Sequence, residues 1–265
     1  SEKRYFKLFV KGNSSQTENK YLQLFDAISR QATYNEAVLL KKFEYGKNPN
    51  GLAVAKNYLF QLILKSLRNY GYNNSVDAEV IGLIQDTQSL YYRRQFEAAQ
   101  RNILKARKIA ISIKREDLLL SISRWERLLV EQLSEATTYV DRYKDIMKRE
   151  EQASRILEIN TSLFTQYKKM QFKNLKEGYK RADRINSFFI HVLNDPLLSE
   201  NQIPSNPTTL LYYWMCYFEY YCGIGDNKKS FQISQQITDL FDSHPWLKTF
   251  DTESYLVCRY NYLLF

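Results

Sequence analysis

The residue types that most often carry out nucleophilic or metal chemistry are scarce, since the chain has two histidines and three cysteines. A zinc site needs histidine and cysteine ligands in short, paired spacings, and no such pairing occurs. His191 follows a segment rich in phenylalanine and isoleucine, which is typical of a packed or helix-capping histidine. His244 precedes Pro245 in a segment that indicates a solvated turn. We therefore expect no metal ion and no cofactor.

The cysteines, Cys216, Cys222 and Cys258, are odd in number and show no ligand-pair spacing. Cys216 and Cys222 lie six residues apart in a predicted helix, so their side chains point to different faces. Such thiols are more often packed in a core than part of a site. A disulfide framework is not indicated, and a reducing, cytoplasmic location is the expectation. No apolar run approaches the ~20 residues of a membrane span, so we expect no membrane partner.

Other catalytic patterns are equally poorly represented. Gly223-Ile224-Gly225 follows a predicted helix rather than a strand, which favours a helix stop over a phosphate-binding loop. Glu150 and Glu151 are adjacent on a polar helix and are interpreted as part of a solvated face. No serine has the surroundings of a nucleophile elbow. We predict that the chain is not an enzyme; a helical enzyme whose site is assembled from distant residues is the least favoured hypothesis.

The composition favours helices as the elements that position all of these residues. The 265 residues include only 8 Gly and 5 Pro, which disfavours a turn-rich all-β fold. Hydrophobic residues make up 44% and charged residues 25%, a balance typical of soluble globular chains. The 21 tyrosines suit the seams between stacked helices, because a tyrosine ring can be buried while its hydroxyl contacts water.

The segment 88–113 shows the expected structural unit most clearly. Tyr91 and Tyr92 end one predicted helix, residues 93–95 form a tight turn, and Phe96 begins a second helix. Apolar residues then recur at alternating steps of four and three residues, which places them on one helix face: Ala99, Ile103, Ala106, Ala110 and Ile113. The small side chains of this stripe allow a neighbouring helix to approach closely.

Turn and capping signals divide the whole chain into roughly twelve helices. Asn206 followed by Pro207 predicts a helix start, and Gly225 followed by Asp226 predicts a helix stop and a new cap. Between the segment 88–113 and Asn206, the pattern predicts a polar helix from Ser134 towards Asn160 and separate helices at 162–172 and 175–193. A helix N-terminal to all of these, or an extended arm, is expected at 1–14.

Short turns make neighbouring helices antiparallel, and pairs that each expose two apolar faces must stack. We therefore predict an all-α fold, an α-α superhelix or solenoid of antiparallel helix pairs. The expected domain organisation is a single helical-repeat domain over 1–265, with a soft boundary at 194–206 where Pro196, Pro204 and Pro207 exclude helix.

Two segments resemble the tetratricopeptide repeat, whose period is about 34 residues. The first resemblance rests on five positions: Tyr91, Phe96, Ala99, Ile103 and Ala106. The second rests on an aromatic pair and the following turn: Trp214, Tyr221, Gly225 and Asp226, although Ser230 and Ile237 replace the usual small alanines. A third, weaker resemblance to the repeat rests on Tyr34 and Ala37. The resemblance covers about half of the chain, and the opening residues 3–9 look like uncharacterised bacterial helical-repeat proteins.

In the tetratricopeptide family the first helix of each pair lines a concave surface that binds peptides. Carried over position by position, the resemblance implies these peptide-binding candidates: Tyr212, Met215 and Glu219 on one helix, and Gln85, Ser89 and Arg93 on another. It implies a non-catalytic scaffold that binds a protein or peptide partner. The aromatic density of 207–222 has a second interpretation, which is packing between repeats, and the residue types alone fit both.

The net charge of +9 is concentrated in two segments. Residues 93–115 contain eight Lys or Arg against one acid, and residues 168–184 contain seven against two. The candidate basic-surface residues are Arg94, Arg101, Lys105, Lys108, Lys173, Lys176 and Lys180. Two solvated helix faces would explain this pattern, and so would a surface for RNA or DNA, which is the alternative function.

Overall fold

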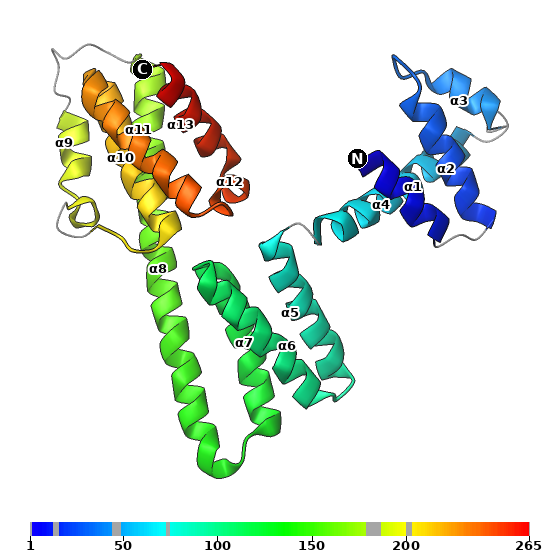
Figure 1. Cartoon of the computed structure of the whole chain (residues 1–265), viewed down its shortest axis with the longest axis horizontal. Helices are drawn as coiled ribbons and strands as arrows, with labels where there is room; N and C mark the ends of the chain where they lie inside the picture. Colours follow the sequence, from blue (N-terminus) through cyan, green and yellow to red (C-terminus); the bar gives the residue numbers. More distant parts are fainter. Residues whose placement is uncertain are drawn as a thin grey trace. The chain divides into compact units, whose positions relative to one another are not determined.

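The computed structural model describes residues 2–12, 16–43, 49–72, 75–178, 187–199 and 203–264. Over these ranges the chain forms thirteen α-helices and one short 3₁₀ helix, and it contains no strand (Figure 1). The predicted all-α class is confirmed, and neighbouring helices pack on one another as a helical solenoid requires. In the part of the chain that is described, none of the helices combines the length and apolar character needed to cross a bilayer.

The helices are, in chain order, α1 (Glu2–Gly12), α2 (Gln16–Ser29), α3 (Glu36–Lys42), α4 (Pro49–Tyr72), α5 (Val76–Tyr92), α6 (Phe96–Ser112), α7 (Glu116–Leu133), α8 (Ala136–Glu177), α9 (Ser187–Leu193), the 3₁₀ helix η2 (Pro196–Leu198), α10 (Pro207–Ile224), α11 (Asn227–Ser243), α12 (Leu247–Phe250) and α13 (Thr252–Leu264).

The chain divides into two compact units, Ser1–Glu79 and Val80–Phe265. The boundary therefore falls in the first turn of α5, whereas the sequence predicted one domain with a soft boundary at 194–206. That segment, of which 200–202 lie outside the described residues, does not separate two bodies, because the second half of α8 before it packs against α10 after it.

The first unit contains α1 to α4 around one small core. Phe6 and Val10 of α1 are buried there together with Leu24, Leu52 and Leu59. The predicted arm at 1–14 is thus a helix that packs against α4 and α2 over the part that is described, which ends at residue 12.

Three helix pairs of the second unit share one turn geometry. Each turn has a single residue with left-handed backbone: Arg94 (φ 59°), Lys114 (φ 51°) and Gly225 (φ 75°). In each, this residue donates its N–H to the carbonyl three residues back, and the next residue donates to the carbonyl five residues back. This is the Schellman pattern of helix ends. The predicted helix end at Tyr92 and the start of α6 at Phe96 are confirmed. The helix α10 ends at Ile224 with Gly225 as its cap, two residues beyond the predicted end at Cys222, so Gly223 lies within the helix.

The predicted stripe of α6 forms the centre of the core between α5, α6 and α7. Ala99, Ile103, Ala106, Ala110 and Ile113 are all buried. Trp125 of α7 packs against them and meets Tyr91 of α5 edge-on, with ring centroids 5.8 Å apart. The alternation of four and three residues therefore identified the packed face correctly.

The longest element, α8, differs from the prediction. Residues 136–177 form one continuous helix, where the sequence pattern predicted a break after Asn160 and another near residue 174. The segment contains neither Gly nor Pro, and its 42 residues span about 63 Å. Its first half packs on α7 and its second half on α10, so each half has its own apolar face and the helix needs no break.

The aromatic helix α10 packs against both α8 and α11. Its start is capped as predicted, because Asn206 Oδ1 accepts from the N–H groups of Thr208 (3.0 Å) and Thr209 (3.4 Å). Asn206 Nδ2 also donates to the carbonyl of Lys114 at 3.1 Å, which joins α10 to the turn between α6 and α7. A helix that is apolar on nearly all sides is buried in this way.

Candidate functional site

The concave part of the second unit is a groove formed by three helices. The middle helix, α7, packs against both α6 and α8, while α6 and α8 make almost no contact with each other over their described lengths. The floor of the groove is therefore α7, and its two walls are α6 and α8. All three are long helices held by a buried core, so the groove is built on rigid elements.

Two cavities lie one after the other along this groove. The first, which we call the arginine cavity, has a volume of about 230 Å³. Its lining includes Arg107, Arg142 and Arg149 and the apolar side chains of Ile103, Leu129 and Ile146, one from each of the three helices. The second, the aliphatic cavity, has a volume of about 300 Å³, and most of its lining surface is apolar. Five of its eleven lining residues are aliphatic (Ile111, Leu119, Ile122, Ala153 and Ile156), and the others are polar or charged: Arg107, Glu116, Ser123, Glu126, Arg149 and Gln152.

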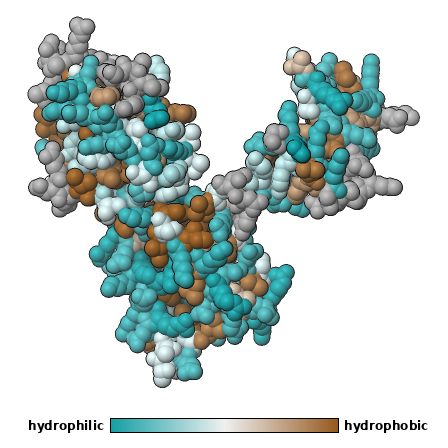
Figure 2. Space-filling model, viewed as in Figure 1, coloured by the Kyte–Doolittle hydropathy of each residue, from teal (hydrophilic) through white to brown (hydrophobic). Residues whose placement is uncertain are grey.

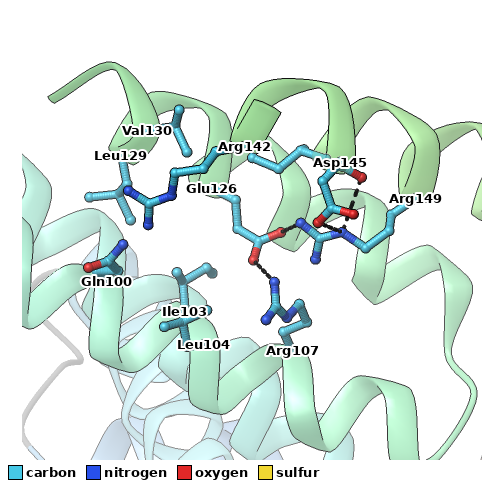
Figure 3. Close-up of a pocket in the computed structure, with 11 residues that line it drawn as sticks. Gln100, Ile103, Leu104, Arg107, Glu126, Leu129, Val130, Arg142, Asp145 and Arg149 are labelled. Atoms are coloured by element: carbon cyan, nitrogen blue, oxygen red, sulfur yellow. Dashed lines mark hydrogen bonds and ion pairs between the residues drawn. The ribbon is translucent and has the colours of Figure 1, made fainter. Parts of the chain in front are cut away.

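A carboxylate bridge lines both cavities. Figure 3 shows the carboxylate of Glu126 between the guanidinium groups of Arg107 and Arg149. Glu126 of α7 is only 6% exposed. Its Oε1 accepts from Arg107 Nη1 of α6 at 2.7 Å, and its Oε2 lies 3.3 Å from Arg149 Nη2 of α8. That second contact is an ion pair, since among the described residues Oε2 accepts no hydrogen bond. One buried carboxylate thus ties both walls to the floor.

The remaining charges leave the arginine cavity with a positive surplus. Arg149 Nε lies 3.3 Å from Asp145 Oδ2, and Arg142 Nη1 donates to Ser134 Oγ at 3.0 Å. Three guanidinium groups therefore face two carboxylates, those of Glu126 and Asp145. This arrangement favours an acidic group in the cavity, because a carboxylate binds guanidinium groups through charge-assisted hydrogen bonds.

Reasoning from the sequence missed this site. Its signal was a charge within an apolar stripe: Glu126 stands four residues after Ile122 and three before Leu129, on the buried face of α7. A carboxylate is seldom buried without a cationic partner. The partners themselves, Arg107 and Arg149, come from other helices and could not be identified from spacing within α7.

The peptide-binding prediction for α10 was wrong. Met215 and Glu219 are 1% and 3% exposed, and Tyr212 is also buried. Tyr212 packs against Phe164 of α8, with ring centroids 5.1 Å apart, and Glu219 Oε2 accepts from Asn174 Nδ2 at 2.7 Å. The unbroken second half of α8 covers the face on which a peptide was expected to lie.

The candidates on and next to α5 are exposed. Gln85 and Ser89 lie four residues apart on one face of α5, and Arg93 directly follows Tyr92, the last residue of that helix. Arg93 Nη1 donates to the carbonyl of Ser89 at 2.8 Å. None of the three lines either cavity of the groove, and their role in binding stays a prediction.

Four of the basic-surface candidates lie at the turn before α6 or on α6 itself, and all four side chains are exposed: Arg94, Arg101, Lys105 and Lys108. The three on α6 are spaced by four and three residues, on the side opposite the buried stripe. On α8, Lys176 is exposed and Lys173 lies with its Nζ 5.6 Å from the centroid of Phe188. Lys180 lies outside the described residues.

These two basic sets are distant from each other within the second unit. Arg149 of α8 lies opposite α6, because Glu126 contacts both Arg149 and Arg107 of α6. Lys173 lies 24 residues after Arg149 on the same continuous helix. At 1.5 Å per residue, this separation is about 36 Å. Two other cations of the first segment have structural partners: Arg107 binds Glu126, and Arg115 binds Asp117 at 2.7 Å.

No protein-family model, no curated protein and no solved structure matches this chain. The likeness to tetratricopeptide repeats accordingly rests on the sequence positions named above. The groove between α6, α7 and α8, with its two cavities and its central carboxylate, is the feature on which a functional argument can be built.

Proposed function

We propose that this chain is a non-catalytic scaffold that binds a protein or peptide partner in the groove between α6, α7 and α8. The observation that carries the proposal is the pair of cavities over α7, which combine apolar lining with a few directed polar groups. Concave sites of this kind are the usual places for ligand side chains, and arginines are frequent hot spots of interfaces.

The rigidity of the groove supports the same proposal. Its floor is fixed by Ile122, Trp125 and Leu129 in the core beneath it, and Glu126 ties the floor to both walls. A preformed groove loses little conformational freedom when a partner binds, so more of the contact energy appears as affinity.

The test is a selection from a random library of linear peptides against the full chain, followed by binding measurements with two matched variants. Gln152→Trp places an indole in the aliphatic cavity, whereas Ser154→Trp places one on an exposed position of α8 that lines neither cavity. We expect selected peptides to lose at least about tenfold in affinity with the first variant only. Peptides that bind both variants and the wild type equally would contradict the proposal.

A second candidate function, binding of RNA or DNA, is supported by the exposed stripe of Arg101, Lys105 and Lys108 on α6. Phosphate binding would make the affinity fall steeply with salt. The measurement is a titration with generic RNA and DNA at two salt concentrations, comparing the wild type with the double variant Arg101→Glu/Lys108→Glu. Absence of binding at low salt would remove this candidate.

We further propose that the fold is tetratricopeptide-like and bacterial, and that the protein works in the cytoplasm. The three Schellman turns and the buried stripe of α6 support the first part, and the likeness of residues 3–9 supports the second. The free cysteines, two of them buried, suit a reducing compartment.

A further inference from the structure

We propose that the occupant of the groove is an amphipathic α-helix of a partner protein, with an acidic side chain in the arginine cavity and an aliphatic side chain, seven residues away, in the aliphatic cavity. The inference rests on the proposed function and specifies its ligand. Three features of the groove support it: its width, the spacing of its cavities and the distribution of charge.

The width of the groove suits a helix. Packed helices lie about 8–10 Å apart, and the two walls both pack on α7 without packing on each other, so they are more than about 8–10 Å apart. A further helix needs about 8–10 Å to each neighbour and can contact both walls at once.

The spacing of the cavities matches a helical repeat. The arginine cavity lies at the level of Leu129 on α7 and Ile146 on α8, and the aliphatic cavity at the level of Ile122 and Ala153. Both steps are seven residues, or about 10.5 Å along the helix axes. Side chains at positions i and i+7 of a bound helix are separated by the same rise and point to nearly the same side.

The two cavities differ in the side chain that they suit. In the arginine cavity, Arg142 extends from α8 across the opening towards Leu129, away from the Glu126 bridge (Figure 3). An incoming carboxylate would bind this guanidinium and neutralise the positive surplus, whereas a basic side chain would increase it. The charge of the cavity therefore selects an acidic anchor.

The aliphatic cavity, at about 300 Å³, is the larger of the two. Ile111, in the last turn of α6, lines it and is 53% exposed. Figure 2 shows hydrophobic side chains gathered over the end of α6 and the start of α7. An aliphatic anchor would displace water from this surface, which is the main favourable contribution to its binding.

The experiment uses the full chain and a displayed library of 21-residue helices, stapled on one face and randomised on the other. Helices that bind in the groove are recognised because their affinity falls with the Gln152→Trp variant. We expect these sequences to be enriched in pairs of an acidic and an aliphatic residue seven positions apart. Replacing that acid by its amide should weaken binding about tenfold, as expected for a charge-assisted hydrogen bond.

Arg142→Gln supplies the matched protein variant, and Arg155→Gln, on an exposed part of α8 outside both cavities, is its control. We expect only Arg142→Gln to abolish the preference for the acid over the amide, with both variants unfolding at the wild-type temperature. An equal preference in all three proteins would overturn the inference.

The two proposals fail in different ways. Helices that bind in the groove without the acid-to-aliphatic spacing would overturn this inference and leave the proposed function standing. If only the linear library yields binders that Gln152→Trp weakens, this inference is likewise wrong and the proposed function stands. If neither library yields binders that Gln152→Trp weakens, both proposals are wrong.

Discussion

Two glutamates of the second unit, Glu126 and Glu219, are buried in different surroundings. Glu126 has two arginine partners from two helices. Glu219 accepts hydrogen bonds from Asn174, a neutral side chain, and burial raises its pKa above the ordinary value more strongly than Asn174 and the charge of Lys168 lower it. The first carboxylate is held by opposite charge, while the second is held mainly by a neutral amide.

The raised pKa of Glu219 predicts a pH-dependent stability. Between the ordinary pKa, 4.5, and the raised folded-state pKa, the folded chain binds more protons than the unfolded chain. The contribution of this group to stability is therefore present below pH 4.5 and lost as the pH rises through the folded pKa. Glu219→Gln keeps an acceptor for Asn174 and does not titrate.

We expect urea unfolding to show Glu219→Gln gaining stability relative to the wild type as the pH rises above 4.5, with a constant difference below it. Glu253→Gln, at an exposed position of α13, is the control and should show no such trend of comparable size. A difference between Glu219→Gln and wild type that does not change from pH 4 to pH 8 would contradict the assignment.

At the scale of single elements, the three Schellman turns differ in the type of residue that adopts the left-handed backbone. Gly225 adopts its left-handed backbone without strain, while the same conformation costs Arg94 and Lys114 roughly 1–2 kcal/mol each. The sequence placed glycine at only one of three equivalent turns.

Arg94→Gly should stabilise the chain by about 0.5–1 kcal/mol, because the relief of left-handed strain exceeds the extra entropy that glycine loses on folding. Gly225→Ala should destabilise it by roughly 1–2 kcal/mol for the converse reason. Urea unfolding of both variants measures these changes. A loss of stability in Arg94→Gly would show that the arginine side chain contributes more than its backbone costs.

The contact between α8 and α10 depends on Gly223. A Cβ at this position would lie 2.6 Å from Asn174 Oδ1 and 2.9 Å from Phe189 Cζ. Alanine is favoured over glycine within a helix by about 1 kcal/mol, but here overpacking is the larger effect.

We therefore expect Gly223→Ala to lower the free energy of unfolding by about 1–3 kcal/mol, as measured by denaturant titration. Adding Phe189→Leu, which removes Cζ, should make the combined loss smaller than the sum of the two single losses. A Gly223→Ala variant as stable as the wild type would contradict this expectation and mean that the side chains of Asn174 and Phe189 move aside without cost.

At the scale of the whole molecule, the cores follow the division into two units. One hydrophobic cluster contains residues from Phe6 to Leu59, and the clusters around α6 and α10 contain residues from Val80 onward. A unit with its own core is expected to fold alone.

The fragment 75–265, which keeps Ser75 at the start of α5, should therefore unfold cooperatively on heating. Circular dichroism should give it a midpoint that coincides with one transition of the full chain. It should also bind the peptides selected for the groove with unchanged affinity. A fragment without a cooperative transition would show that residues 1–74 are needed for the second unit to fold.

The sequence by itself determined the features that depend on neighbours along the chain. The alternating steps of Ala99 to Ile113, the cap at Asn206 and the stop at Gly225 gave the all-α class and several helix ends correctly, because hydrogen bonds and helical periodicity act over a few residues. Tertiary structure alone decided the length of α8, the burial of Met215 and Glu219, and the site at Glu126. Each of these depends on which helix covers which face, and that follows from burying apolar surface between segments far apart in the chain.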